Sequence, residues 1–148
     1  MRIVNATKEH LDTVLEIEKK SFTMPWSKDS FKAELDMGAH FTVSEEESGQ
    51  ITGFCILRAY GEEAELFHIA VLPEYRRRHT AEMLLMEALH YARSKKADSV
   101  YLEVRQSNFA ARGLYEKCGF EEIGIRRGYY DFPNEDAVIM ICRPEDEL

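Results

Sequence analysis

Cysteine is scarce in this chain, and the three that occur, Cys55, Cys118 and Cys142, lie far apart. There is no CxxC pair and no paired cysteine and histidine spacing, so the sequence predicts no zinc site. The five histidines are scattered, and we assign none of them to a metal. An odd number of cysteines without a signal sequence fits a reducing compartment, so we expect a cytoplasmic protein.

Long hydrophobic runs are missing as well. No apolar stretch approaches the roughly 18 residues that a membrane-spanning helix needs. The opening segment MRIVNATKEH is too polar for a signal peptide. We also find no repeats, no low-complexity segment and no linker. The 148 residues therefore predict one domain, residues 1–148, that buries a core of its own and does not associate with a membrane.

Positive charge is in deficit, because 19 lysines and arginines stand against 27 aspartates and glutamates, for a formal net charge of -8. This balance argues against non-specific binding to nucleic acid or to anionic lipid. It suits a cationic partner or substrate, although many proteins are acidic for solubility alone. Any basic site must therefore be local.

Hydrophobic periodicity predicts seven strands and four helices in the order β-α-α-β-β-β-α-β-α-β-β. Thr7, Ser27 and Asn108 are the predicted N-caps. A loop that contains Tyr129 and Tyr130 is expected between the last two strands. This order indicates an α/β (α+β) fold with a mixed, mostly antiparallel sheet and helices on both faces. The strands are expected at residues 2–6, 41–44, 51–58, 65–71, 99–104, 122–126 and 137–142.

The stretch from Glu65 to Leu85 joins a buried strand, a basic turn and a helix. It reads ELFHIAV, then LPEYRRRHTA, then apolar residues at helical spacing. The first N–H groups of a helix have no partner within it, and the helix dipole favours anions there. Arg76, Arg77 and Arg78 add positive charge beside these groups. The stretch predicts either a phosphate or pyrophosphate site or a solvated basic loop before an ordinary helix.

Two side chains are suited to proton transfer. Glu103, at the end of a strand, is either a general base or an ordinary outward-facing carboxylate. Tyr115, on a helix, is either a general acid toward a thiolate of similar basicity or a core tyrosine. Trp26, between two helices, either lines a groove or anchors the core. Cys118 ends an amphipathic helix, where packing is a simpler role than nucleophilic attack.

Taken together, these motifs resemble the GCN5-related N-acetyltransferases (GNAT). The resemblance rests on FHIAVLPEYRRRHTAEMLL, on YLEVRQSNFAARGLYEKCGF and on the spacing from Asn108 through Tyr115 to Phe120. Four shorter motifs are similar to bacterial members that acetylate the N-terminal amine of a small-subunit ribosomal protein. Each motif alone is weak, but together they cover nearly the whole chain in order and at spacing. They are PWS at 25–27, LEVRxSN at 102–108, RRxYY at 126–130 and EDAxxM at 135–140.

The resemblance implies the GNAT fold and an acetyl-CoA-dependent N-acetyltransferase that uses no metal. Glu103 would be the general base and Tyr115 the general acid in direct attack of an amine on the thioester, and Asn108 would contact CoA. Backbone groups of Ile69, Ala70 and Val71 would bind pantetheine and the thioester carbonyl. Trp26, Tyr129 and Tyr130 would shape a peptide groove. The pyrophosphate loop would comprise Arg76, Arg77, Arg78, His79, Thr80, Ala81 and Glu82.

The partner implied by the resemblance is a basic protein or peptide N-terminus, from a ribosomal protein. We expect no nucleic acid, no membrane, and a monomer or weak dimer. Two alternatives remain open. One is an acetyltransferase for a small amine, such as a polyamine or an amino sugar. The other is a non-catalytic acyl-CoA-binding module.

The chain departs from the family at one position of the pyrophosphate loop. The family pattern is Arg/Gln-x-x-Gly-x-Gly/Ala, whereas this chain has Arg76-x-x-His79-x-Ala81. Glycine there lets the backbone approach phosphates closely and tolerates unusual φ values. His79 either crowds the pyrophosphate or bonds to it. It is also the one feature that favours the non-catalytic alternative.

Overall fold

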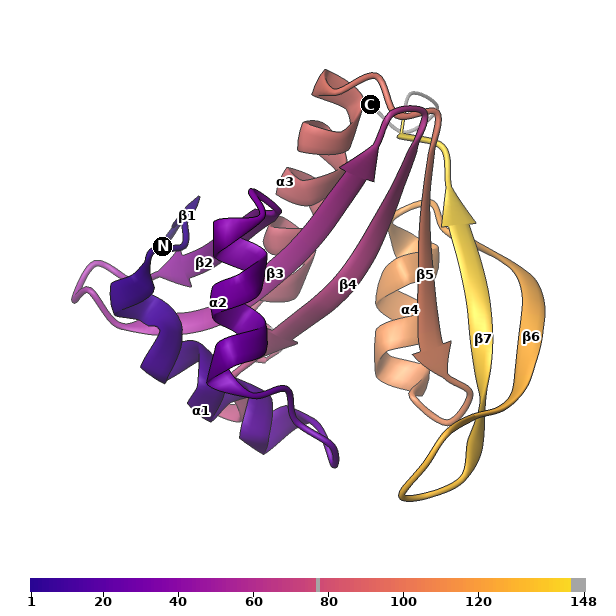
Figure 1. Cartoon of the computed structure of the whole chain (residues 1–148), viewed down its shortest axis with the longest axis horizontal. Helices are drawn as coiled ribbons and strands as arrows, with labels where there is room; N and C mark the ends of the chain where they lie inside the picture. Colours follow the sequence, from indigo (N-terminus) through magenta and orange to yellow (C-terminus); the bar gives the residue numbers. More distant parts are fainter. Residues whose placement is uncertain (77, 145–148) are drawn as a thin grey trace.

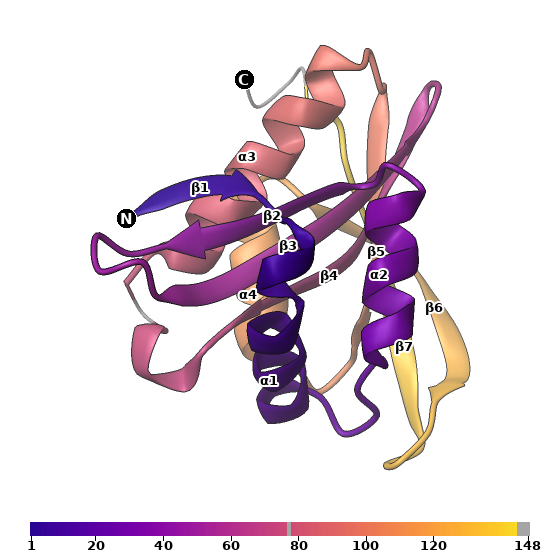
Figure 2. The ribbon, with the colours of Figure 1, turned by 60° about the vertical axis from the view of Figure 1, so that its left-hand side comes forward.

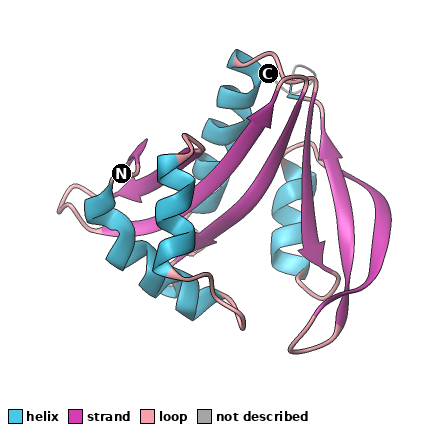
Figure 3. Cartoon of the chain, viewed as in Figure 1, coloured by secondary structure: helices cyan, strands magenta, loops and turns pink. Residues whose placement is uncertain are grey.

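The computed structural model describes residues 1–76 and 78–144 of the chain. Seven strands form one sheet in the order β1-β2-β3-β4-β5-β7-β6 (Figures 1 and 3). They are β1 (Arg2–Asn5), β2 (His40–Glu45), β3 (Ile51–Tyr60), β4 (Glu63–Val71), β5 (Ser99–Arg105), β6 (Glu121–Tyr130) and β7 (Glu135–Cys142).

Two helices cover each face of the sheet (Figure 2). On one face lie α1 (Leu11–Ser21) and α2 (Lys28–Asp36), and on the other lie α3 (Thr80–Ser94) and α4 (Phe109–Lys117). Each face buries its own apolar cluster, because alternate side chains of a strand point to opposite faces. The first cluster includes Val14, Phe31 and Phe54, and the second includes Leu85 and Leu89.

The β4–β5 junction differs from every other junction of the sheet. It is the parallel one, and α3 supplies the crossover between its two strands. Its pairing covers only Glu63↔Ser99, Ala64↔Val100 and Glu65↔Tyr101. Beyond that point the two strands diverge (Figure 1), so the sheet is divided into two halves that are joined at one end.

A β-bulge in β4 lies immediately after this short junction. Ile56 of β3 pairs with His68, whereas Leu57 pairs with Leu66, so Phe67 is an extra residue in β4. An extra residue bends its strand and increases the local twist. The bulge thus contributes to the divergence of β4 from β5.

The predicted order of elements is confirmed, as are two of the predicted caps. The Ser27 hydroxyl accepts the Ser30 N–H at 3.2 Å, and Asn108 Oδ1 accepts the Ala111 N–H at 3.2 Å. Thr7 precedes a short 3₁₀ turn, Lys8–His10, so α1 begins later than predicted. The expected loop at Tyr129 and Tyr130 was wrong, because β6 continues through both residues and pairs Tyr130 with Glu135.

Candidate active site

The ends of β4 and β5 bring two helix N-termini to one edge of the sheet. Because the strands are parallel, both run toward this edge, where β4 leads through a short 3₁₀ turn, Pro73–Tyr75, to α3, and β5 leads to α4. Ligands of α/β proteins commonly bind at the carboxyl ends of parallel strands. Ile69, Ala70 and Val71, the last three residues of β4, lie here, past the last described pair with β5. The Val71 carbonyl accepts a hydrogen bond from Arg76 Nε at 3.1 Å.

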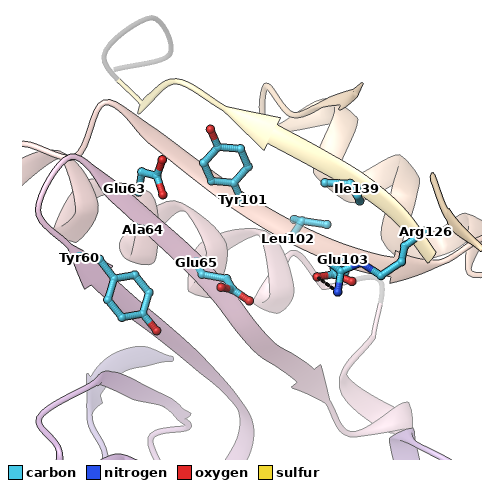
Figure 4. A pocket seen from close by; sticks show the side chains of 9 residues that line it. All are labelled: Tyr60, Glu63, Ala64, Glu65, Tyr101, Leu102, Glu103, Arg126 and Ile139. Carbon is cyan, nitrogen blue, oxygen red and sulfur yellow. Dashed lines mark ion pairs between the residues drawn. The ribbon is translucent and has the colours of Figure 1, made fainter. Parts of the chain in front are cut away.

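An acidic pocket of about 270 Å³ lies beside the β4–β5 junction (Figure 4). Glu103 Oε1 lies 3.6 Å from Arg126 Nη1, while Glu103 Oε2 is buried and has no hydrogen-bond partner among the described residues. Burial and the nearby Glu103 carboxylate raise the pKa of Glu65. The pocket therefore carries an excess of negative charge and suits a cationic group. Its lining is Tyr60, Glu63, Ala64, Glu65, Tyr101, Leu102, Glu103, Arg126 and Ile139.

Tyr115 approaches the same region from the opposite face of the sheet. Leu102 and Val104 belong to the same apolar cluster as Tyr115, and strand alternation points Glu103, which lies between them, the other way. Tyr115 is buried, with only 6% of the residue exposed. Burial, followed by the proximity of Cys55 and Tyr130, raises the pKa of the Tyr115 hydroxyl far above its usual value. It therefore keeps its proton at neutral pH, as a general acid must.

His79 occupies the N-cap of α3 with a left-handed backbone, φ 63° and ψ 9°. This is the region that glycine enters most readily. Its Nδ1 lies 3.1 Å from Glu82 Oε2, and that oxygen also accepts a hydrogen bond from Lys117 Nζ at 3.1 Å. The imidazole is thus turned onto the first turn of α3. The hydrogen bond from His79, followed by that from Lys117, lowers the pKa of the Glu82 carboxyl.

The other residues of the predicted pyrophosphate loop are divided between solvent and core. Arg76 and Arg78 are exposed, and the guanidinium of Arg78 lies 5.0 Å from the centre of the Tyr75 ring. Thr80 is buried and Ala81 packs against the core. Arg77 lies outside the described residues. The structure thus brings two exposed arginines and the N-terminus of α3 to the edge where β4 ends.

Two loops flank the diverging strands. In the loop between α1 and α2, Trp26 packs against Phe31 and His68, with ring centres 5.5 and 4.1 Å apart. In the loop after β6, Arg105 donates hydrogen bonds to the carbonyls of Asp131 at 2.7 Å and Pro133 at 2.8 Å. The same guanidinium lies over the Tyr130 ring at 4.5 Å, so Arg105 fixes both the loop and Tyr130.

Sequence reasoning missed Glu18, Glu65, His68 and Arg105. Glu18 left a signal, because it is a charged residue within the apolar stripe of the first helix. Arg105 lies within the LEVRxSN motif, but its contacts join residues 26 and 28 positions apart. Spacing within a motif does not indicate such distant partners.

Neither a metal centre nor a membrane span is found in the part of the chain that the structure describes. No group of three or more histidine, cysteine, aspartate or glutamate side chains there is arranged to hold a metal ion. No described helix is long and apolar enough to cross a bilayer.

At this edge of the sheet, two diverging parallel strands each lead to the N-terminus of a helix, and Glu103 and Tyr115 lie on opposite faces of the sheet. The family model described as the acetyltransferase (GNAT) family matches residues 11–120, and the chain belongs to this family. It is 43% identical over 138 residues to a Bacillus subtilis (strain 168) protein provisionally named as a ribosomal protein bS18-alanine N-acetyltransferase. That match covers 92% of this chain and 91% of the relative.

Two further relatives carry the same name. The protein from Haemophilus influenzae Rd is 38% identical over 135 residues, covering 88% of this chain and 90% of the relative. The crystal structure of the ribosomal-protein-S18-alanine N-acetyltransferase from Escherichia coli superposes with a TM-score of 0.88. It is 32% identical and covers 96% of this chain and 92% of that one. The expected fold, a mostly antiparallel seven-stranded sheet with helices on both faces, is therefore confirmed.

Proposed function

We propose that this protein transfers the acetyl group of acetyl-CoA to the N-terminal α-amine of the alanine of ribosomal protein bS18. The relatives that match nearly the whole chain carry this activity in their names. The observation that supports it most directly is the divergence of β4 from β5, with Glu103 on one face of the sheet and Tyr115 on the other. An acyl donor and an amine can meet there between a base and an acid.

The residues at this edge fit acetyl-CoA as co-substrate. Past Glu65, the side of β4 that faces β5 has no described strand partner, so its backbone groups are suited to an extended amide chain such as pantetheine. The N-terminus of α3, with Arg76 and Arg78 nearby, suits the pyrophosphate. Asn108 uses its side-chain oxygen to cap α4, which leaves its amide N–H groups to contact CoA. These assignments need no metal.

We assign one proton transfer to each of the two side chains. An α-amine has a pKa of about 8, so Glu103 needs only to accept one proton as the amine becomes a nucleophile. The nitrogen then forms a bond to the thioester carbon, and the carbon–sulfur bond breaks. Tyr115 donates its proton to the departing thiolate. Backbone N–H groups at the end of β4 are suited to stabilise the negative charge on the carbonyl oxygen.

The acidic pocket supports a basic polypeptide as the acceptor. Glu63, Glu65 and Glu103 line it with one cation, Arg126. The α1–α2 loop with Trp26 and the end of β6 with Tyr129 and Tyr130 flank the strands and are proposed as the walls of the peptide groove. A protein N-terminus is cationic before it reacts, so the charge of the pocket and that of the substrate are complementary.

The test is acetylation of a peptide that carries the bS18 N-terminus, compared with a polyamine as the alternative acceptor. We expect Glu103→Gln and Tyr115→Phe each to lower kcat/KM for the peptide by about 10²–10⁴-fold, the usual effect of losing a positioned acid or base. Glu45→Gln, on the far strand β2, and Tyr91→Phe, on α3, are the matched controls and should retain full activity. Unchanged peptide acetylation by both site variants, or a preference for the polyamine, would refute the proposal.

A further inference from the structure

A buried glutamate and histidine pair lies beneath the α1–α2 loop, residues 22–27. Glu18, near the end of α1, is completely buried. Its Oε2 accepts the backbone N–H of Trp26 at 2.9 Å and lies 3.3 Å from His68 Nε2 on β4. Glu18 Oε1 and His68 Nε2 have no hydrogen-bond partner among the described residues. Thus a helix, a loop and a central strand meet at one carboxyl group.

The ring of His68 supports both ends of this loop. Phe22 stacks on it with ring centres 5.4 Å apart and planes 20° apart, and Trp26 lies 4.1 Å away. His68 Nδ1 lies 3.0 Å from the carbonyl of Phe67, which can only accept, so Nδ1 carries a proton. The next residue along β4 is Ile69. The loop is therefore fixed directly to the segment of β4 that diverges from β5.

A second buried glutamate on the same face, Glu34, forms an ordinary stabilising ion pair and serves as a comparison for Glu18. Glu34 of α2 forms a two-bond ion pair with Arg58 of β3, and the Arg58 guanidinium lies 3.8 Å from the centre of the Phe67 ring. Its contacts join two regular elements, and both of its oxygens are hydrogen-bonded. Glu18 instead accepts a hydrogen bond from a loop, and its Oε1 has no partner among the described residues. Buried charged pairs can often be replaced by apolar residues without loss of stability, so stability alone does not account for Glu18.

We propose that Glu18 and His68 are positioning residues that hold the α1–α2 loop against β4 and so keep this wall of the acceptor groove in place. The inference rests on the proposed function, which places the acceptor at this loop and the thioester at the end of β4. Neither side chain takes part in the chemistry. Loss of the pair should therefore weaken peptide binding and leave the donor site unaffected.

The primary variant is Glu18→Met, which keeps the volume and removes the acceptor for the Trp26 N–H. We expect the peptide KM to rise at least tenfold, kcat to stay within threefold, and the Kd for acetyl-CoA, measured by calorimetry, to stay within twofold. Glu18→Gln retains an acceptor oxygen and should restore the wild-type KM. Glu34→Met, the matched loss of a buried glutamate on the same face, should leave the peptide KM within twofold.

Trp26 supplies a readout that is independent of catalysis, because it is the chain's one tryptophan. Its fluorescence reports the loop directly. We expect quenching by acrylamide to increase at least twofold in Glu18→Met and to stay unchanged in Glu18→Gln and Glu34→Met. His68→Ala, which removes the ring beneath Phe22 and Trp26, should have the same effect. It replaces Glu18→Met as the test variant if Glu18→Met does not fold.

Wild-type KM and quenching in Glu18→Met and His68→Ala would overturn the inference. An equal rise of the peptide KM in Glu34→Met would also overturn it, because the effect would then come from general destabilisation. Failure of the wild type to acetylate the bS18 peptide would refute the proposed function instead. In that case the quenching comparison still tests whether the pair anchors the loop.

Discussion

At the scale of single residues, His79 shows how a substitution can keep a glycine's backbone conformation. The residue adopts φ 63° without being glycine, and its imidazole lies on Glu82, with the side chain 74% exposed. Lys117 holds the same carboxylate from α4. Lys117 therefore offsets the negative charge of Glu82 at the N-terminus of α3, where an anion is expected to bind.

The conformation of His79 allows a comparison of two variants. His79→Gly and His79→Ala both remove the imidazole, but only alanine must adopt the left-handed conformation with a Cβ atom. We therefore expect the glycine variant to be more stable than the alanine variant by about 1 kcal/mol, as measured by urea unfolding. Equal stabilities would show that the backbone leaves the left-handed region once the imidazole is gone. Calorimetric titration of acetyl-CoA into the same proteins would show whether the histidine also affects donor binding.

The Glu18–His68 pair makes a prediction about pH. Burial raises the pKa of Glu18 from 4.5 to about 7 and lowers that of His68 from 6.5 to about 4. Between pH 4.5 and 6.5 the folded pair holds one proton on Glu18, and the unfolded pair holds one proton on the histidine. Because the proton counts are equal, the pair contributes no slope to stability in this window.

Replacing either residue alone should reveal a pH dependence of the free energy of unfolding, with opposite sign in the two variants. In Glu18→Gln only the lowered pKa of His68 remains, so stability is lost as pH falls from 6.5 toward 4. In His68→Asn only the raised pKa of Glu18 remains, so stability is lost as pH rises from 4.5 through 7. Each slope can reach about 1.4 kcal/mol per pH unit relative to the wild type. Urea unfolding at half-unit pH intervals measures both, and parallel curves for all three proteins would contradict the assignment.

At the scale of elements, the path of β4 depends on a glycine in its neighbour. Gly53 of β3 pairs with Val71, and a Cβ atom at this position would lie 2.8 Å from the carbonyl oxygen of Ala70 and 3.0 Å from Val71 Cγ2. These contacts involve backbone as well as side chain, so they cannot be relieved by a rotamer change alone.

We expect Gly53→Ala to destabilise the protein by about 1–3 kcal/mol, the usual cost of overpacking a core. It should also weaken acetyl-CoA binding, because the end of β4 must move. Chemical denaturation and calorimetry measure the two effects. Gly113→Ala is the control, since a Cβ atom there meets nothing within 4 Å. Full stability of Gly53→Ala would mean that β3 and β4 separate more easily than this packing indicates.

The elements were predictable because their signals are local. Ser27 and Asn108 cap helices through contacts with residues three positions away, and apolar periodicity marks each strand. The bulge at Phe67 and the early end of the β4–β5 pairing were not predictable, because both are set by register between distant strands. The same holds for Tyr130, whose pairing with Glu135 continues β6 where the sequence indicated a loop.

At the scale of the whole molecule, the net charge of -8 should influence how a basic substrate binds. Exposed charges are screened over about 10 Å at 0.1 M salt and about 3 Å at 1 M. We therefore expect the KM for a basic bS18 peptide to rise by about threefold or more as salt increases through this range. A peptide with the same first residues and a neutral remainder is the control. A KM that does not change with salt would show that the acidic pocket plays no part in binding.

For the candidate site, the sequence names residues but does not indicate their arrangement. Motif spacing predicts roles for Glu103 and Tyr115, and only the folded sheet shows that strand alternation places them on opposite faces. Arg105 and Glu18, which position the flanking loops, act on partners that the chain brings near only by folding. A motif can thus name candidate side chains, whereas the contacts that orient them depend on the tertiary structure.

The short junction between β4 and β5 has a consequence for how the protein behaves in the cell. Only three described residue pairs join the two halves of the sheet. We therefore expect the part of β4 past Glu65 to exchange its amide hydrogens early and to be cleaved early by proteases. A donor molecule that occupies this gap binds the folded state alone and, at a concentration of 100 times its Kd, would add about 2.7 kcal/mol of stability. The lifetime of the protein would then depend on the supply of acetyl-CoA.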